Sequence, residues 1–252
     1  MIEVKNINKS FDGNHVLKNI SAVFETGKTN MIIGASGSGK TVLMKSIIGL
    51  HRVDTGRIEY DGRNLPEMRM GDIRVLRREV GMLFQGSALF DSLSVLENVM
   101  YPLEMFAKTS KPEMVERARI CLQRVSLPEK SFALAPSEIS GGMQKRVAIA
   151  RAIALQPKYL FCDEPNSGLD PQTSLIIDQL IHEITQEFDI TTIINSHDMN
   201  SVMEIGENIF YFNKGEKAWQ GSKEDIFHVD NEDLNNFVFA SELYKKVRRT
   251  NS

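Results

Sequence analysis

The sequence is poor in cysteine, and its histidines show no metal-binding pattern. Its 252 residues include two cysteines and five histidines. Cys121 and Cys162 stand far apart, neither belongs to a C-x-x-C pair, and Cys162 lies in an apolar run. We therefore predict two buried thiols, and we exclude a disulfide framework or a cysteine-based metal site.

The sequence also lacks an excess of either charge and any long apolar run. It carries 30 basic and 33 acidic residues, and this balance gives no long-range field suited to nucleic acid, so we expect no nucleic-acid partner. No stretch approaches the roughly 18 consecutive apolar residues of a membrane-spanning helix. Residues Met1 to Lys5 alternate like a strand and do not resemble a secretory leader. We therefore expect a cytoplasmic protein.

A complete phosphate loop is present. Residues Gly34 to Thr41 read Gly-Ala-Ser-Gly-Ser-Gly-Lys-Thr, which matches G-x-x-x-x-G-K-[ST], and the apolar run Met31 to Ile33 precedes them. In such a loop, backbone N–H groups and the N-terminus of the next helix surround the phosphates. The lysine reaches the β- and γ-phosphate oxygens, and the threonine hydroxyl binds Mg²⁺. The motif therefore predicts a site for a nucleoside triphosphate with Mg²⁺.

Apolar periodicity predicts an α/β fold. Residues 1–25 and 57–62 read as short strands joined by turns, which predicts a small antiparallel sheet. From about residue 94 to 125 the pattern is helical, with S-x-x-E capping signals that begin at Ser94 and Ser110. Strand and helix patterns then alternate as far as residue 195, which predicts a mostly parallel sheet covered by helices.

Two other segments also have helical patterns. Leu43, Ile47 and Leu50 recur at helical spacing after the phosphate loop. Beyond Gly221, a polar stretch carries the apolar residues Phe227, Leu234, Phe237, Val238 and Phe239. We expect this stretch to pack either on its own chain or on a second copy. The basic run at 245–249 is interpreted as a solvated end, with contact to anionic lipid headgroups as the alternative.

An apolar strand pattern that ends in two carboxylates forms a second chemical element. Residues Tyr159 to Cys162 precede Asp163 and Glu164. The C-terminal ends of parallel strands are where ligands bind in sheets of this kind. A carboxylate there can hold the Mg²⁺ shell, and its neighbour can orient or deprotonate an attacking water. We predict the first role for Asp163 and the second for Glu164.

The order of motifs resembles the ATP-binding cassette (ABC) ATPases over nearly the whole chain. The motifs that carry the resemblance are the phosphate loop, Phe84-Gln85, Ser140-Gly141-Gly142, the Asp-Glu pair, Ser167 to Asp170, and Ser196-His197-Asp198. The resemblance implies an ABC-type nucleotide-binding domain of the P-loop NTPase class that hydrolyses ATP. It would span residues 1–221, with a helical insert at about 89–137 and a C-terminal extension at 222–252.

The same resemblance implies roles for particular residues. Glu164, His197 and Gln85 would be the catalytic set, with Gln85 sensing the γ-phosphate and the metal. Ser140, Gly141 and Gly142 would contact ATP bound to a second copy, and Asp170 would link the two sites. The metal set would be Thr41, Gln85 and Asp163. The nucleotide-binding set would be Phe11, Val16, Gly34, Ala35, Ser36, Gly37, Ser38, Gly39, Lys40, Thr41 and Val42. Phe11 would stack on adenine, and the alternative for it is a core position on a strand.

Three segments look like one branch of this family, the ATPase subunits of Mla-type phospholipid transporters. They are Ser140 to Met143, Met82 to Phe90, and Asn98 to Leu103. Ile139 and Met143 replace the leucine and glutamine of the family's usual Leu-Ser-Gly-Gly-Gln signature. This likeness implies phospholipid transport for outer-membrane lipid asymmetry and a place on the cytoplasmic face of the inner membrane. The implied partners are a second copy, permease subunits, a substrate-binding MCE-type protein and a STAS-domain regulator.

Other functions are also compatible with parts of this sequence. An ABC importer for another substrate, such as an amino acid, would carry the same motifs. A GTPase would need an N-K-x-D loop, whereas Asn213 to Glu216 lacks the aspartate. A soluble ABC protein of translation or DNA repair usually has a second cassette or a long coiled coil, and this chain has neither.

Overall fold

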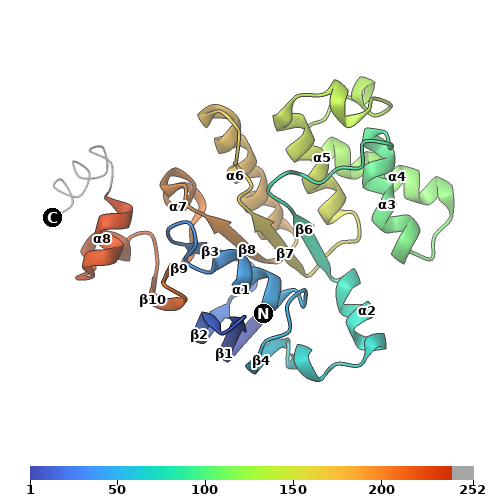
Figure 1. Ribbon diagram of the computed structural model, residues 1–252. Coiled ribbons are helices and arrows are strands. Elements are labelled where there is room, and N and C mark those ends of the chain that lie inside the picture. Colours follow the sequence, from blue (N-terminus) through green and yellow to red (C-terminus); the bar gives the residue numbers. More distant parts are fainter. Residues whose placement is uncertain (240–252) are drawn as a thin grey trace. The chain divides into compact units, whose positions relative to one another are not determined.

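The computed structural model describes residues 1–239 (Figure 1). The chain divides into two compact units. Unit 1 contains residues 1–68 together with residue 193 onward, and unit 2 contains residues 69–192. The basic run at 245–249 lies outside the described residues. None of the helices formed by residues 1–239 has the length and apolar character needed to span a lipid bilayer.

Unit 1 contains a small antiparallel sheet. β1 (Ile2–Phe11) pairs with β2 (Asn14–Phe24) on one side and with β4 (Thr55–Tyr60) on the other, and β4 pairs with β5 (Arg63–Asn64). Two-residue turns at Asp12-Gly13 and Asp61-Gly62 join the strands, and all four turn residues have positive φ, as such tight hairpins require. The antiparallel sheet predicted from the sequence is therefore confirmed.

A second set of strands in unit 1 leads into the phosphate loop. β3 (Thr29–Ile33) runs parallel to β9 (Asn208–Asn213), which pairs antiparallel with β10 (Glu216–Gly221). β8 (Thr191–Ser196), which ends in this unit, is the next neighbour of β3 in the strand order. The loop after β3 enters α1 (Lys40–Ile47), and α7 (Met199–Ile205) connects β8 to β9. Leu50 lies beyond the end of α1 with 59% of its surface exposed, so its predicted place on that helix is wrong.

Unit 2 combines two parallel strands with helices. β6 (Val80–Leu83) runs parallel to β7 (Tyr159–Asp163). The helices are α2 (Met70–Arg78), α3 (Val95–Phe106), α4 (Lys111–Arg124), α5 (Gly141–Ile153) and α6 (Pro171–Glu187), with short 3-10 turns at 129–131 and 136–138. Helices α3, α4 and α5 contact one another (Figure 1). Parallel pairing in both units confirms the predicted mostly parallel α/β fold. The boundaries of the helical insert remain a prediction.

Two local predictions for unit 2 are confirmed. Ser94 and Ser110 are the N-caps of α3 and α4, and each backbone N–H donates to the carboxylate of the glutamate three residues later. Cys121 and Cys162 are both free and buried. Burial raises the pKa of both thiols, so they remain protonated and unreactive at neutral pH.

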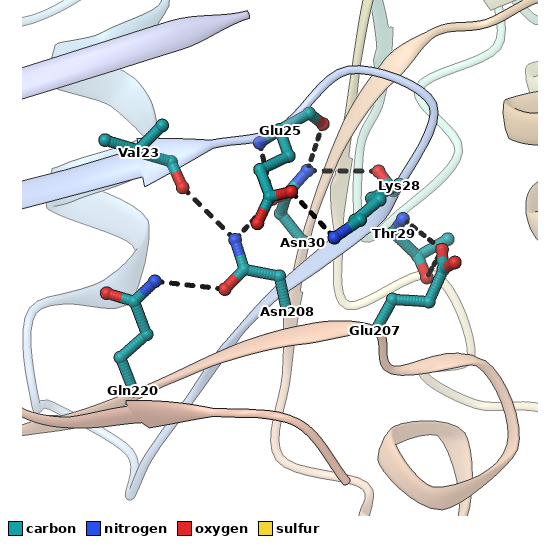
Figure 2. A network of polar contacts seen from close by, with 8 residues as sticks. All are labelled: Val23, Glu25, Lys28, Thr29, Asn30, Glu207, Asn208 and Gln220. Atoms are coloured by element: carbon teal, nitrogen blue, oxygen red, sulfur yellow. Dashed lines mark hydrogen bonds and ion pairs between the residues drawn. The ribbon is translucent and has the colours of Figure 1, made fainter.

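A buried polar network joins the entrance of β3 to β9 in unit 1 (Figure 2). Asn30, which is fully buried, accepts from Glu25 N and from Asn208 Nδ2, each at 2.8 Å, and its amide donates to the carbonyls of Glu25 and Lys28. Asn208 also donates to Val23 O at 3.1 Å. Because buried polar groups are costly without partners, this network fixes the β2–β3 turn against β9. It therefore holds the start of β3, the strand that leads into the phosphate loop, in position.

The segment beyond Gly221 packs on its own chain as far as it is described. A 3-10 turn covers Asp225–His228, and α8 covers Glu232–Val238. Leu234 and Val238 are buried, and the ring of Phe237 lies 5.6 Å from that of Tyr211 on β9. Tyr211 also donates to Asp233 O at 3.2 Å. Residues 222–239 therefore pack on the same chain, and docking on a second copy stays a prediction.

Candidate functional site

The phosphate loop forms a close turn between β3 and α1. Gly34 has φ of 150°, and a Cβ atom there would lie 2.2 Å from Phe212 O. Gly39, the residue before α1, has φ of 109°, which L-residues with side chains rarely adopt. Both positions therefore require glycine because of their backbone conformation, and Gly34 also requires it because a side chain would clash with Phe212 O. The sequence pattern and the local structure agree on a loop built to bring backbone N–H groups together.

Polar side chains of this loop fit a triphosphate. Lys40 is 7% exposed, and its ammonium lies inside the loop, donating to Gly34 O at 2.7 Å and to Ala35 O at 3.2 Å. The Ser38 hydroxyl is buried and has no hydrogen-bond partner among residues 1–239. Thr41 is exposed in the first turn of α1. A cationic donor, a buried hydroxyl without a partner and a helix N-terminus together match the chemistry of phosphate oxygens.

In unit 1, Val16 lies beside the loop, and so does a turn that the sequence did not indicate. A contact of Val16 with the nucleotide stays a prediction. A Cβ at Gly39 would lie 3.2 Å from Val16 O. The β9–β10 turn also contacts the loop, because Gly215 N donates to Ser38 O at 3.0 Å and Lys18 N donates to Gly215 O at 2.9 Å. In the sequence, Asn213 to Glu216 resembles only an incomplete guanine-binding motif. Its structural role depends on a pairing distant in sequence.

Phe11 lies at the end of the β1–β2 hairpin and is 38% exposed. Its ring meets that of His51 edge-on at 5.2 Å, and Lys9 Nζ lies 5.0 Å from its centroid. This exposure argues against a core position and leaves ring surface available for stacking. Its role in binding adenine stays a prediction.

His197 follows the last residue of β8 and is exposed. The same strand contacts the phosphate-loop helix, since Asn195 Nδ2 lies 3.6 Å from Met44 Sδ of α1. After His197, Asp198 caps α7 by accepting from Asn200 N at 2.9 Å. β3 and β8 are neighbouring strands. The phosphate loop follows β3, and His197 follows β8.

The carboxylates that were predicted to act on metal and water lie in unit 2 at the end of β7. Asp163 is the last residue of the strand, and Glu164 follows it with φ of 49°. A glutamate rarely adopts this left-handed conformation, and such strain is typical of functional sites. Gln85, just after β6, donates through Nε2 to Ser167 Oγ at 3.2 Å, and Ser167 N donates to Glu164 O at 3.1 Å. The structure therefore brings Gln85 to the turn that carries Glu164.

Ser140, Gly141 and Gly142 form the N-terminal end of α5. Ser140 is the N-cap, and its hydroxyl accepts from Met143 N at 3.3 Å. Met143, which replaces the glutamine of the usual signature, therefore contributes its backbone N–H to this cap. A glutamine side chain is present one position later, where Gln144 Nε2 donates to Pro136 O at 2.9 Å. The exposed Ser140 and Gly141 leave this helix end open to another molecule.

Asp170 has a structural role within its own chain. It is the N-cap of α6, and its carboxylate accepts from Thr173 N at 3.0 Å. Hydrogen bonds from Thr173 hold the pKa of Asp170 below its usual value. A Cβ at Gly142 would lie 2.7 Å from Thr173 Cγ2, so the start of α5 packs tightly against the start of α6. The link between two copies through Asp170 stays a prediction.

The chain matches known proteins over nearly its full length. A family model described as ABC transporter matches residues 17–167. A methionine import ATP-binding protein, MetN, of Clostridium tetani is 36% identical over 96% of this chain and 76% of its own length.

Two solved structures extend the similarity to the fold. One is a dimeric post-hydrolysis state of the ATP-binding cassette MJ0796 bound to ADP and Pi, with a TM-score of 0.81, 32% identity, and coverage of 88% of this chain and 98% of that one. The other is cbiO1 from Clostridium perfringens, part of the ABC transporter complex cbiONQ. It has a TM-score of 0.83, 30% identity, and coverage of 99% of this chain and 97% of that one.

Proposed function

Because this chain belongs to the ABC transporter family, we propose that it is the ATP-hydrolysing subunit of a membrane transporter and that two copies act together on the cytoplasmic face of that membrane. The chain is an ATPase that uses ATP and Mg²⁺. The dimer in the MJ0796 structure and the complex that contains cbiO1 support a paired subunit attached to a permease. In this proposal, Ser140, Gly141 and Gly142 of one copy contact the ATP held by the other.

The proposed mechanism assigns each residue a separate task. The phosphates are held by the backbone amides of the loop, by Lys40, and by Val42 at the start of α1. Glu164 orients the attacking water and accepts its proton. Gln85 and His197 respond to the γ-phosphate. Thr41, through its hydroxyl, together with Asp163 and Gln85 would hold Mg²⁺, which would supply positive charge against the phosphate oxygens.

A cavity in unit 2 is the proposed docking site for a cytoplasmic segment of the permease. Its volume is about 400 Å³, and its lining comes from β6, α3, α5 and the segment after β6, including Phe84, Phe90, Tyr101, Met105, Arg151 and Ala152. Phe90 and Met105 are 41% and 53% exposed, so this apolar surface is accessible. Val95, the first residue of α3, is fully buried and does not line the cavity.

Changing Met105 to glutamate is expected to abolish copurification of the permease, because a carboxylate would be placed in an apolar docking surface. Thermal unfolding of the variant should match the wild type, since this side chain is more than half exposed. Ile120→Glu on α4 is the matched control, because Ile120 is 46% exposed and does not line the cavity. Equal copurification with both variants would show that the permease docks elsewhere.

The name of the MetN relative favours an importer of a small polar solute such as an amino acid. A phospholipid transporter is the second candidate, and the Ser-Gly-Gly-Met signature with its flanking segments supports it. Only this second candidate requires an MCE-type protein and a STAS-domain regulator as partners.

Purifying the tagged chain from its native membrane and identifying the copurified permease separates the two candidates. If the importer proposal is right, the purified complex in vesicles should hydrolyse ATP faster when its amino-acid cargo and binding protein are added. Stimulation by phospholipid with a copurified MCE-type protein would instead support the second candidate. A chain that copurifies with no membrane protein would contradict both.

A further inference from the structure

Helix α5 holds the segment that follows β6 through two cationic side chains. Arg151 donates to Ala88 O and to Ser87 O, both at 2.7 Å. Six residues earlier on the same helix, Lys145 donates from Nζ to the carbonyl of Gln85. Three backbone carbonyls within residues 85–88 thus accept hydrogen bonds from one helix. The segment is fixed to α5 at both of its ends.

The backbone of this segment adopts a conformation that it would not choose on its own. Ser87 and Ala88 have φ of 61° and 47°, in the left-handed region that residues with a Cβ seldom occupy. Such a conformation persists only where surrounding contacts determine it. The hydrogen bonds from α5 are contacts of this kind, so they help to fix the backbone position of Gln85 at the start of the segment.

Lys145 is unusual because it is charged and buried. Only 4% of its surface is exposed, and this burial lowers the pKa of its ammonium group. Buried charges are costly unless they are paired. In the described part of the chain, the Gln85 carbonyl is the one hydrogen-bond acceptor found for Lys145 Nζ. An apolar residue would fill this site at lower cost, which points to a role in placing Gln85.

We propose that Lys145 is a positioning residue for ATP hydrolysis that acts through Gln85. It holds the Gln85 carbonyl, so the Gln85 side chain lies against Ser167 and thus against the turn that carries Glu164. Because Lys145 is on the helix that begins at Ser140, it ties Gln85 to the signature residues of the same chain. This inference rests on the proposed function.

Replacing Lys145 with methionine tests the proposal in the full chain assembled with its permease. We expect kcat for ATP hydrolysis to fall about 10-fold, the lower range for loss of a charged hydrogen bond. The KM for ATP should stay within about twofold, because the variant leaves the phosphate loop unchanged. Lys145→Arg, which keeps a cationic donor, should recover most of the lost kcat. An unchanged kcat in the methionine variant would overturn the proposal.

A double-mutant cycle tests whether Lys145 acts through Gln85. In a Gln85→Ala background, Lys145→Met should lower kcat by less than about twofold further, because residues that act as one unit are not additive. A second full 10-fold loss would overturn the proposed route. Lys223→Met is the matched control, since Lys223 also donates to a backbone carbonyl, Glu204 O at 3.4 Å, and its kcat should match the wild type.

Two further observations separate the possible failures. If Lys145→Met does not fold, Lys145→Leu, which also removes the donor, takes its place in both experiments. Loss of folding in both variants would make Lys145 a structural residue and would overturn the proposal. A wild-type complex that hydrolyses no ATP would contradict the proposed function itself. Normal wild-type hydrolysis with a normal Lys145→Met variant would contradict only the positioning role.

Discussion

Replacing Glu164 with glutamine is expected to lower ATP hydrolysis by at least about 100-fold while ATP binding is retained. The amide has nearly the same shape as the carboxylate, but it cannot accept a proton from the attacking water, and general-base catalysis typically contributes about 100-fold or more. Steady-state ATPase assays on the purified transporter and nucleotide-binding titrations measure the two quantities separately.

The same variant should also lengthen the life of the paired state, since the ATP that joins the two copies is not consumed. Light scattering of Glu164→Gln with and without Mg·ATP is expected to show a dimer only with nucleotide. Glu183→Gln on α6 is the control, because the Glu183 side chain is 62% exposed and forms a surface ion pair with Arg124. Near-normal turnover of Glu164→Gln would remove this residue from its proposed role.

Lys40→Ala is expected to weaken ATP binding by about 10- to 100-fold, because a hydrogen bond to a charged group contributes about 1.5–3 kcal/mol. The ammonium is positioned inside the phosphate loop by Gly34 O and Ala35 O, so its loss removes the loop's only cationic side chain. Isothermal titration with a slowly hydrolysed ATP analogue measures the change in Kd.

Lys45→Ala provides the matched control for this change, since Lys45 is on the same helix but is exposed. It should bind the analogue as tightly as the wild type. If Lys40→Ala also binds with wild-type affinity, the loop does not hold phosphate through its lysine. If both variants bind weakly, the effect arises from the stability of α1.

The sequence predicted those features that short stretches of chain specify by themselves. The phosphate loop is recognisable because the backbone conformation of the loop itself, with positive φ at Gly34 and Gly39, requires glycine. The caps at Ser94 and Ser110 are local for the same reason, since each bond joins residues three apart. The strand before Asp163 is readable from its continuous apolar run. The order of these motifs along the chain was enough to predict the family and the ATPase activity.

Other features depend on residues far apart in the sequence, and only the tertiary structure revealed them. The contact of Gly215 with the phosphate loop, the cavity beside Phe90 and the bond from Lys145 to Gln85 each join segments separated by dozens of residues. A lysine within a helical pattern normally reads as a solvated residue, yet Lys145 is buried. Periodicity reports which face of a helix is apolar, but the carbonyl that a buried side chain meets is determined by how the helices and strands pack together.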